Sequence, residues 1–503
     1  MGLFEEVLFD YQKVAAQRIA VEKRLLLADQ PGLGKTLEVL GGLEQAGLLT
    51  TDLSNILVLT PIINAHTTWV DSVERFVKPL YPNVAVVDLS KGSSKQKNER
   101  INIDAVGPIV YVANHDALAV VKNVPRLPEL LKIKWDAVIV DESHLVLPIK
   151  DSRKPTNFWK GLMKLQYQSG AIRVAVSGTP DRGKLENRYG TWLFLSPNLV
   201  GFHQWAWLER TFWIVEQKVS KTRVVKMVKG LKDELSWLNT DKEYMLRRTK
   251  AEVLPELPPK RYVDVSVEMT DKQKSAYLSQ QLDSTAKLNE ARANEANSGE
   301  AMVFALRARQ ISDCSWSENE PVVGGDSAKL DWLIEWLSER GFIEFDEMAD
   351  NKAKVVIVSQ FSKVLHWLKQ ELANVGVVSS VLDGSCNDRE RISIQEEFQS
   401  GSLRVVLLSG GMGVGINLDA ADDLIMFDSS YDPDRVEQIE DRVHRASSNH
   451  SVTIWNLVGK DTIDEVIMER VSERYATTRK LLDGSRGVIF GREIMKMVGN
   501  RNG

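Results

Sequence analysis

Two series of short aliphatic runs, one in each half of the chain, constrain the fold more than any other feature of the sequence. Each run is rich in β-branched residues, is apolar on both faces and ends in polar or turn residues, which is typical of a strand buried in a parallel sheet. Helical-looking stretches separate the runs, so each half predicts a doubly wound α/β unit. The first series is 24–29, 55–61, 84–90, 108–114, 136–142 and 172–178, and the second is 354–361, 377–384, 403–410, 422–429 and 451–458.

The predicted organisation is therefore two α/β domains, residues 1–262 and residues 263–503. A chain of 503 residues is too long for one hydrophobic core, which agrees with this division. Each domain has a predicted helical insertion, which is basic and aromatic at about 185–245 and polar at about 270–325. Within the first insertion, the alternation of Val and Lys in KVSKTRVVKMVKG (218–230) predicts a β-hairpin.

Composition and the lack of certain sequence patterns exclude several classes of protein. Hydrophobic residues make up 43% of the chain and charged residues 26%, as in ordinary globular domains. No segment has the length of a membrane span, the N-terminus lacks a signal segment, and Cys314 and Cys386 form no disulfide framework or zinc-binding spacing. We expect no membrane partner and a reducing compartment, the cytoplasm of a bacterial, archaeal or virus-infected cell, or the nucleus in a eukaryote. The net charge of −5 argues against a nucleic-acid coat but permits a local basic groove.

The segment ADQPGLGKT joins the first aliphatic run to an amphipathic stretch, which is where an open α/β sheet binds ligands. Gly32 and Gly34 allow backbone N–H groups to turn toward phosphate oxygens. Lys35 adds a mobile positive charge, and Thr36 is placed to ligate Mg²⁺. The usual phosphate loop has a glycine where Asp29 stands. A glycine-rich turn capped by threonine is the alternative, and the strand–loop–helix context favours the phosphate loop.

The segment DAVIVDESH ends a predicted strand in two carboxylates. Asp141 suits a Mg²⁺ ligand and Glu142 a base for the attacking water. A second strand ends in SGTP (177–180), whose hydroxyl groups suit a sensor of the γ-phosphate. An Asp-Glu pair that merely caps a strand is the simpler alternative, but it leaves the phosphate loop upstream in the same predicted sheet unexplained. Together the motifs predict hydrolysis of ATP with Mg²⁺.

The order of these motifs resembles the Swi/Snf family of DNA translocases in helicase superfamily 2, whose loop also has Asp at position 29. FDYQ (9–12) is similar to the family's opening segment, DESH to its DEAH box, and YMLRRTKAEVLPELPPK (244–260) to the segment between its two lobes. SAKLDWLIEWL, KVVIVSQF, LDGS and the long segment ending in QIEDRVHR resemble the remaining motifs. The sequence departs from the family pattern at Gln30-Pro31, at Gly410 and after Arg445. The resemblance covers about residues 9–470 and implies two tandem RecA-like lobes with helical insertions.

The resemblance also implies a composite ATP site. An arginine from another domain is a recurrent way to stabilise the charge that develops in phosphoryl transfer. Arg442 and Arg445 are three residues apart and would share one face of a helix, with Gln438 a turn earlier; a surface salt-bridge pattern is the alternative. The predicted catalytic residues are Lys35, Asp141, Glu142, Gln438, Arg442 and Arg445, the predicted metal ligands are Thr36 and Asp141, and the predicted nucleotide-binding residues are Gln12, Asp29, Gln30, Pro31, Gly32, Leu33, Gly34, Lys35, Thr36, Gly413 and Gly415.

A motor that grips every sequence must hold DNA through its phosphates. The predicted contacts lie where strands end, and Arg247 and Arg248 are left open between bracing the lobes and binding DNA. The predicted DNA-binding residues are Thr60 with Trp69 nearby, Asn114, His115, Ser359, Gln360, Ser409 and Gly410.

The sequence thus predicts a DNA-dependent ATPase, a monomeric motor that translocates on double-stranded DNA in repair, recombination, replication or the remodelling of protein–DNA complexes. A targeting protein is a further candidate partner. One alternative is a strand-separating, branch-migrating or annealing helicase that acts on forks and Holliday junctions. Another is a non-catalytic clamp gated by ATP, which the joint presence of Lys35, Glu142 and both arginines disfavours.

Overall fold

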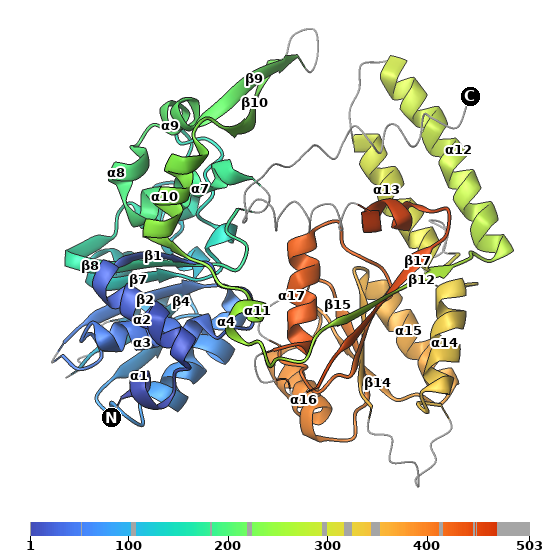
Figure 1. The fold of residues 1–503 in the computed structure, drawn as a ribbon, viewed down its shortest axis with the longest axis horizontal. Helices are drawn as coiled ribbons and strands as arrows, with labels where there is room; N and C mark the ends of the chain where they lie inside the picture. The colour runs from blue at the N-terminus through green and yellow to red at the C-terminus, as the bar shows by residue number, and fades with distance from the viewer. Residues whose placement is uncertain are drawn as a thin grey trace. The chain divides into compact units, whose positions relative to one another are not determined.

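The computed structural model describes residues 2–51, 53–101, 107–181, 184–218, 224–293, 299–315, 324–343, 353–411, 416–445, 448 and 450–469. The chain divides into two compact units, residues 1–255 and 256–503, each built on its own parallel sheet (Figure 1). Within the described residues, no helix combines the length and the apolar character needed to cross a membrane.

Unit 1 contains a seven-stranded parallel sheet in the order β11–β1–β8–β7–β2–β4–β3. Alternate residues of a strand enter opposite cores: Ile56 and Val58 pack with helices on one face of the sheet, while Leu57 and Leu59 pack with helices on the other face. This explains why the strands are apolar on both faces. The strands are β1 (Arg24–Leu27), β2 (Asn55–Thr60), β3 (Ala85–Asp88), β4 (Ile109–Asn114), β7 (Lys134–Val140), β8 (Gln166–Val176) and β11 (Met245–Leu246), with a small ribbon of β5 (Val120–Val121) and β6 (Val124–Pro125).

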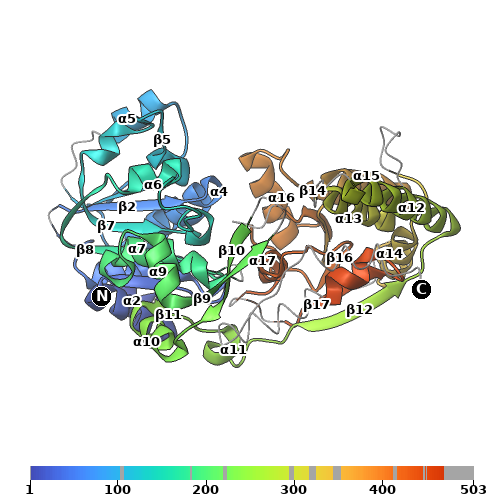
Figure 2. The same cartoon turned by 90° about the horizontal axis from the view of Figure 1, so that it is seen from above.

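The helices of unit 1 cover both faces of this sheet (Figure 2). The main α-helices are α1 (Leu3–Glu6), α2 (Asp10–Glu22), α3 (Lys35–Gln45), α4 (Ile62–Asn64), α5 (Ser94–Ile101), α6 (Asn157–Leu162), α7 (Arg188–Leu195), α8 (Pro197–Val200), α9 (Gln204–Thr211), α10 (Glu234–Tyr244) and α11 (Lys250–Val253). Two π-helical turns, η1 (Ala65–Val70) and η2 (Val73–Val77), follow α4, and short 3₁₀ turns are η3 (His115–Leu118), η4 (Pro128–Leu131), η5 (Ser143–Leu145) and η6 (Leu185–Asn187).

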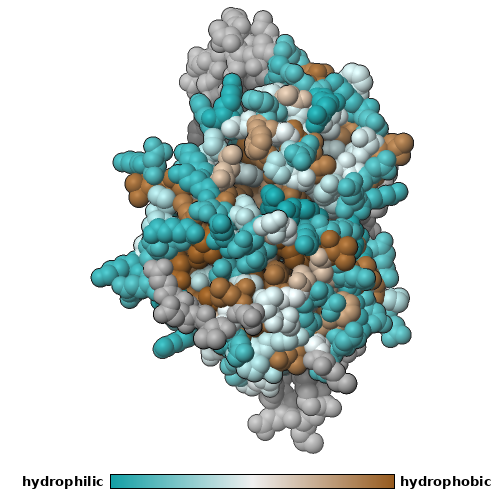
Figure 3. All heavy atoms as spheres, turned by 90° about the vertical axis from the view of Figure 1, so that its left-hand side faces the viewer, coloured by the Kyte–Doolittle hydropathy of each residue, from teal (hydrophilic) through white to brown (hydrophobic). Residues whose placement is uncertain are grey.

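The predicted insertion at 185–245 combines helices with a hairpin. The hairpin pairs β9 (Phe212–Lys218) with β10 (Val224–Leu231) and projects as a ribbon from the body of unit 1 (Figure 1). Its first strand begins earlier than the Val/Lys pattern predicted, because Phe212 is buried among Trp207 and Trp237 and anchors the ribbon. The surface of unit 1 seen in Figure 3 is mostly hydrophilic, with hydrophobic side chains in separate patches.

Unit 2 contains a six-stranded parallel sheet in the order β12–β17–β16–β13–β15–β14. Its strands are β12 (Arg261–Val267), β13 (Val355–Ser359), β14 (Ser379–Leu382), β15 (Val405–Ser409), β16 (Asp423–Met426) and β17 (Thr453–Gly459), and its helices are α12 (Asp271–Ala293), α13 (Gly299–Asp313), α14 (Ala328–Glu339), α15 (Ser362–Asn374), α16 (Asp388–Ser400) and α17 (Pro433–Val443). The helices α12 and α13, from the predicted insertion at 270–325, pack against each other (Figures 1 and 2).

Every aliphatic run contains a strand, and the predicted fold class of two parallel-sheet α/β units is confirmed. The division between the units lies at Pro255, whereas the sequence placed it after residue 262. The reason is β12, which begins at Arg261 and pairs with β17, so it belongs wholly to the second sheet. The entry to β12 is anchored in unit 2, because Lys260 pairs with Glu440 at 3.0 Å and the carbonyl of Pro258 accepts a 2.6 Å hydrogen bond from His444.

Candidate ATP-binding and hydrolysis site

The loop between β1 and α3 has the backbone geometry of an anion cradle. Gly32 and Gly34 have φ of 86° and 78°, in the left-handed region that glycine adopts without steric cost. A side chain at Gly34 would also collide with the amide of Gln12. Gly34 is the N-cap of α3 and provides no side-chain cap, so the first N–H groups of the helix remain available to an anion.

Lys35 and Thr36 are the first two residues of α3. The Nζ atom of Lys35 donates to the carbonyl oxygen of Asp29 at 2.8 Å and to that of Gln30 at 3.3 Å, so its charge lies across the loop. The hydroxyl of Thr36 follows directly on the helix. Both side chains are half-buried.

The start of α2 holds the same loop. Gln12 is buried, and its Nε2 donates to the carbonyl of Leu33 at 2.9 Å while its Oε1 accepts from the N–H of Phe9. The hydroxyl of Tyr11 donates to the same Leu33 carbonyl at 2.9 Å. The sequence placed Gln12 among the nucleotide-binding residues, and in the structure its amide contacts the loop between β1 and α3.

A buried charge cluster lies under the loop, and its pairing was not foreseen. Asp29 and Glu38 are both fully buried, and both pair with the guanidinium of Arg248, whose Nη2 is 2.8 Å from a Glu38 oxygen. Burial, together with the charge of Asp29, raises the pKa of Glu38 well above its ordinary value. Arg248 also donates to the carbonyl of Tyr11 and lies over its ring.

These contacts bear on the two interpretations left open for Arg247 and Arg248. Arg247 donates to the carbonyls of Ala28 at 3.0 Å and Gly178 at 2.9 Å. Both arginines therefore brace the phosphate loop and its neighbouring strand end within unit 1.

The unusual pair Gln30-Pro31 has a structural explanation. The side chain of Gln30 accepts a 2.8 Å hydrogen bond from the N–H of Lys250, at the start of α11, and its own N–H donates to the carbonyl of Arg248. The ring of Pro31 covers Gly178, where an added Cβ would be only 2.8 Å from the proline Cδ. The two departures from the family pattern thus join the phosphate loop to the segment after β11 and to the SGTP turn.

Asp141 directly follows β7 and is held by neutral donors. One carboxylate oxygen, Oδ2, accepts from Thr60 Oγ1 at 2.8 Å, from Trp69 Nε1 at 3.0 Å and from Asn64 Nδ2 at 3.4 Å. The other, Oδ1, accepts from the N–H of Glu142 at 2.9 Å. A carboxylate has about four lone-pair sites, so Oδ1 retains capacity for a further partner.

Glu142 has a strained backbone and a defined partner. Its φ is 45° and ψ is 46°, a left-handed conformation that costs a non-glycine residue about 1 kcal/mol and concentrates at functional sites. Its carboxylate lies 3.3 Å from Nδ1 of His144, which is also 2.8 Å from the hydroxyl of Ser177. The N–H of Thr179 donates to that hydroxyl at 3.2 Å, so a chain of polar contacts joins Glu142 to the SGTP turn.

The residues predicted to bind DNA in unit 1 lie at neighbouring strand ends, since Thr60 and Asn114 are paired last residues of β2 and β4. Thr60 is fully buried against Asp141. Nε2 of His115 is 2.8 Å from the carbonyl of Asp141, which fixes the proton on that nitrogen, and burial lowers the pKa of His115. Thr60 and His115 therefore contact the carboxylate residue of the ATP site, a link that the sequence did not indicate.

In unit 2, α17 ends at Val443, so Arg445 lies just beyond the helix on which the sequence placed it. The N–H of Arg445 donates to the hydroxyl of Ser448 at 2.9 Å in place of a helical carbonyl. Arg442 and Arg445 nevertheless converge on one acceptor, the carbonyl of Ile416, at 3.4 Å and 2.7 Å. Burial lowers the pKa of Arg445. Gln438 lies one turn before Arg442 on α17, and Gly413 and Gly415 lie outside the described residues.

The strand ends of unit 2 carry the other predicted DNA contacts. Ser359 and Ser409 are paired last residues of β13 and β15. Ser359 is fully buried and its hydroxyl donates to Asp428, which also accepts from the N–H of Gln360. The N–H of Gly410 donates to the carbonyl of Ser359 at 2.9 Å, and a side chain at Gly410 would collide with that of Gln360.

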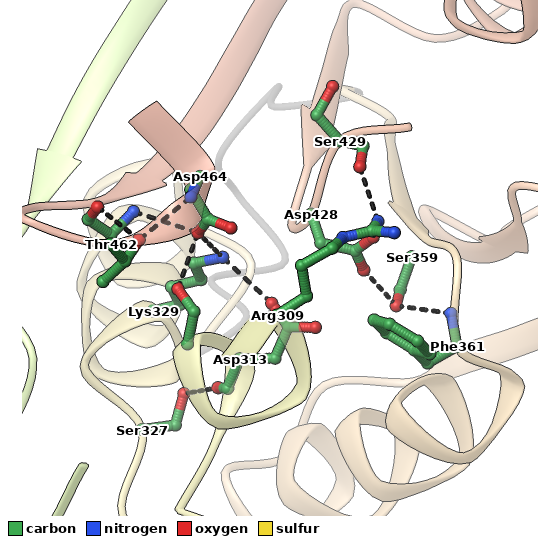
Figure 4. A network of polar contacts seen from close by, with 12 residues as sticks. Arg309, Asp313, Ser327, Lys329, Ser359, Phe361, Asp428, Ser429, Thr462 and Asp464 are labelled. Atoms are coloured by element: carbon green, nitrogen blue, oxygen red, sulfur yellow. Dashed lines mark hydrogen bonds and ion pairs between the residues drawn. The ribbon is translucent and has the colours of Figure 1, made fainter. Parts of the chain in front are cut away.

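A buried ionic network contacts the strand-end residues of unit 2 (Figure 4). Arg309 of α13 pairs with Asp428 at 2.9 Å. Lys329 of α14 lies between Asp313 at 2.9 Å and Asp464 at 2.7 Å. Burial lowers the pKa of Lys329, but the two carboxylates outweigh this effect and raise the pKa above its ordinary value. The network fastens the α12–α13 insertion to the sheet of unit 2.

The residues of unit 1 fit ATP and Mg²⁺. The left-handed glycines and the uncapped start of α3 form a cradle for phosphate oxygens. The Thr36 hydroxyl and the Asp141 carboxylate are hard oxygen donors of the kind Mg²⁺ prefers. Because β1, β8 and β7 are parallel neighbours, the loop after β1 and the carboxylates after β7 lie at the same edge of the sheet. This arrangement defines a P-loop nucleoside triphosphatase fold, here followed by a second unit of the same topology.

The chain belongs to the SNF2-related family, and so to the Swi/Snf ATPases of helicase superfamily 2, as the motifs indicated. The model of the SNF2-related domain matches residues 12–315, and that of the helicase conserved C-terminal domain matches residues 328–447.

The chain is also similar to curated proteins and to a solved structure. The chain is 26% identical over 466 residues to an uncharacterized ATP-dependent helicase, MG018, of Mycoplasma genitalium, covering 91% of this chain and 40% of the relative. It is 25% identical to the ISWI chromatin-remodeling complex ATPase ISW2 of Saccharomyces cerevisiae, covering 89% and 38%. A solved Sulfolobus solfataricus SWI2/SNF2 ATPase core in complex with dsDNA is 21% identical, with a TM-score of 0.41 and coverage of 96% and 94%. The chain spans about two-fifths of the length of the curated relatives it matches.

Proposed function

We propose that this chain is a DNA-dependent ATPase that uses the hydrolysis of ATP to translocate along double-stranded DNA. The observation that carries the proposal is the meeting of the phosphate loop with the Asp141–Glu142 pair at one edge of the sheet. Family membership supports it, as do the names of relatives, which include a chromatin-remodeling complex ATPase and a chromodomain-helicase-DNA-binding protein.

In this mechanism the loop N–H groups and Lys35 would hold the phosphates, and Thr36 and Asp141 would hold the metal ion. Bound Mg²⁺ would neutralise charge on the phosphates. Glu142 accepts the proton of the attacking water, and the contact with His144 orients its carboxylate. The link through Ser177 gives the SGTP turn a way to respond to the γ-phosphate.

Unit 2 contributes cations in this proposal. Arg442 and Arg445 would stabilise the charge that develops on the γ-phosphate, with Gln438 beside them. Their shared contact with the Ile416 carbonyl keeps both guanidinium groups in one place. The strand-end groups Asn114, Gln360, Ser409 and Gly410 would contact DNA phosphates, which is a sequence-independent mode suited to translocation.

The test is Glu142→Gln, which keeps the size of the side chain and removes the base. We expect duplex-stimulated ATP hydrolysis to fall by about 10²–10⁴-fold while nucleotide affinity, measured with a fluorescent ATP analogue, is retained. Glu129→Gln, a surface change near the start of β7, is the control and should behave as wild type. Hydrolysis by Glu142→Gln at the wild-type rate would refute the assignment of the base and the ATPase mechanism built on it.

Substrate choice is tested with wild-type protein. ATPase rates on duplex, single-stranded, forked and four-way DNA are compared with triplex displacement and strand separation. We expect stimulation by duplex and triplex displacement without strand separation. Resolution of junctions would replace translocation with branch migration, and absence of stimulation by any DNA would contradict the proposal.

A further inference from the structure

The carboxylate of Asp141, the proposed metal ligand, accepts hydrogen bonds from one short segment of chain. The three groups that donate to Oδ2 of Asp141 come from Thr60, the last residue of β2, and from Asn64 and Trp69 in the helical turns that follow it. Thr60 and Trp69 are fully buried, and Asn64 is 6% exposed. We call these three residues the Asp141 cradle.

The π-helical geometry of this turn makes the cradle possible. Asn64 and Trp69 are five residues apart, and η1, which spans Ala65–Val70, is π-helical. In an α-helix residues three and four apart share a face. A π-helix, whose hydrogen bonds join residues five apart, brings Asn64 and Trp69 to the same side, and such turns recur at functional sites.

The donors of the cradle are all neutral. The hydrogen bonds that the structure describes to the Asp141 carboxylate come from side-chain groups of Thr60, Asn64 and Trp69 and from the backbone N–H of Glu142, and all four donors are uncharged. Neutral N–H and O–H groups stabilise the charged form of a carboxylate by hydrogen bonding while leaving its charge uncompensated. A cation at the same place would compete with a metal ion for that charge.

We propose that Thr60, Asn64 and Trp69 are positioning residues that hold the Asp141 carboxylate in the orientation that binds Mg²⁺. Oδ2 accepts three hydrogen bonds and Oδ1 accepts one, so Oδ1 has the greater capacity left for a further partner. Groups of this kind around metal ligands typically change metal affinity by 10–100-fold when removed. This inference rests on the proposed ATPase function, because it concerns the same site.

The principal test is Trp69→Phe, which keeps an aromatic ring in the core and removes the Nε1 donor together with part of the ring volume. The matched control is Trp135→Phe. Trp135 is also fully buried in unit 1, and its Nε1 donates to the carbonyl of Leu130 at 3.2 Å, away from Asp141. Both variants lose one buried hydrogen bond, so a purely structural effect would be shared.

The readout is the Mg²⁺ concentration that gives half of the maximal gain in affinity for a fluorescent ATP analogue, measured without DNA. We expect it to rise by about 10-fold in Trp69→Phe, with metal-free nucleotide affinity unchanged, and to stay at the wild-type value in Trp135→Phe. An unchanged Mg²⁺ dependence in folded Trp69→Phe would overturn the proposal.

A second pair keeps the proposal testable if Trp69→Phe does not fold. Thr60→Val removes the hydroxyl at nearly constant shape, and Thr60→Ser restores it. Thr60→Val should raise the Mg²⁺ requirement and Thr60→Ser should not; equal behaviour of the two would also overturn the proposal.

Asp141→Asn separates the further inference from the proposed function on which it rests. Loss of Mg²⁺ dependence in Asp141→Asn but not in the cradle variants would reject the cradle alone, and wild-type protein without Mg²⁺-dependent binding would reject the proposed function as well.

Discussion

Each unit places an aspartate just after the corresponding strand of the same topology, although Asp428 lies one register position further on than Asp141. In unit 1 the strands run β8–β7–β2–β4–β3, and in unit 2 they run β17–β16–β13–β15–β14, which are the same positions in chain order. Asp141 follows β7 and accepts from Thr60 at the end of β2. Asp428 follows β16 and accepts from Ser359 at the end of β13. The strand-end pair of a hydroxyl and a carboxylate is thus present twice.

The surroundings of the two aspartates differ in charge. Asp141 has only neutral donors, whereas Asp428 pairs with Arg309, whose guanidinium also lies over the rings of Tyr431 and Phe361. Arg309 comes from the α12–α13 insertion, which the first unit lacks at this position. The comparison therefore sets a carboxylate with neutral donors against a carboxylate whose charge is paired with a buried arginine from an insertion.

The largest expected effect that tests this comparison is on Asp428. Asp428→Asn would leave the buried charge of Arg309 without its partner, and breaking a buried pair in this way costs about 3–5 kcal/mol. Chemical denaturation followed by circular dichroism should show that loss. The control is Asp326→Asn, which breaks an ion pair of Asp326 with exposed Lys272 and should cost no more than about 1 kcal/mol. Equal losses in the two variants would mean that Asp428 is not a structural ion-pair partner.

Arg309→Gln should lower the free energy of unfolding by less than Asp428→Asn does, and the pH dependence of its loss has a definite sign. Burial raises the pKa of Asp428, and Arg309 opposes that rise. Without the arginine the folded-state pKa moves further above the unfolded value of about 3.9. A raised folded-state pKa gives stability that is present at low pH and is lost as the pH rises through it. The variant should therefore lose more free energy of unfolding, relative to wild type, at pH 8 than at pH 5.

Denaturation of Arg309→Gln and wild type across this pH range measures the difference, with Lys272→Gln as the exposed control. A loss that is constant with pH would show that the carboxylate does not respond to the arginine.

The smallest effect on stability is expected at the counterpart, Asp141→Asn. No buried cation is left without a partner, and the new amide oxygen can still accept from Thr60 and Trp69. One hydrogen bond, from the N–H of Glu142 to Oδ1, is lost, at a cost of about 1 kcal/mol that removal of an uncompensated charge offsets. The thermal midpoint should lie within a few degrees of wild type while ATP hydrolysis is lost. A collapse of stability comparable to that of Asp428→Asn would erase the distinction between the two sites.

Long aliphatic runs made the two sheets predictable, because a strand buried on both faces is marked by its own residues. Two of the edge strands, β11 and β12, were not predicted: β11 has two residues and pairs with β1 alone, and β12 alternates polar and apolar residues at an exposed edge. The phosphate loop and the Asp-Glu pair were predictable because their chemistry lies in contiguous residues.

Contacts between distant segments could not be read from the sequence. Arg248 contacts Asp29, which lies more than two hundred residues earlier in the chain, and no pattern in either segment indicates which residue it contacts. The role of Trp69 depends on a π-helical turn, since α-helical spacing would direct it to another side than Asn64. Thr60 and His115 were identified as site residues, and their contacts with Asp141 emerged only from the fold.

The connection between the units is secured at both of its ends. On one side Arg248 and Gln30 fasten the chain to the phosphate loop, and the N–H of Leu254 still donates to Lys250. On the other side Pro258 is held by His444. The stretch between Leu254 and Pro258 can span at most about 14 Å. So short a tether keeps each unit at a high effective concentration, in the millimolar range, with respect to the other. For any ligand that touched both units, engagement of the second unit would be an intramolecular step, for which individually weak contacts are enough.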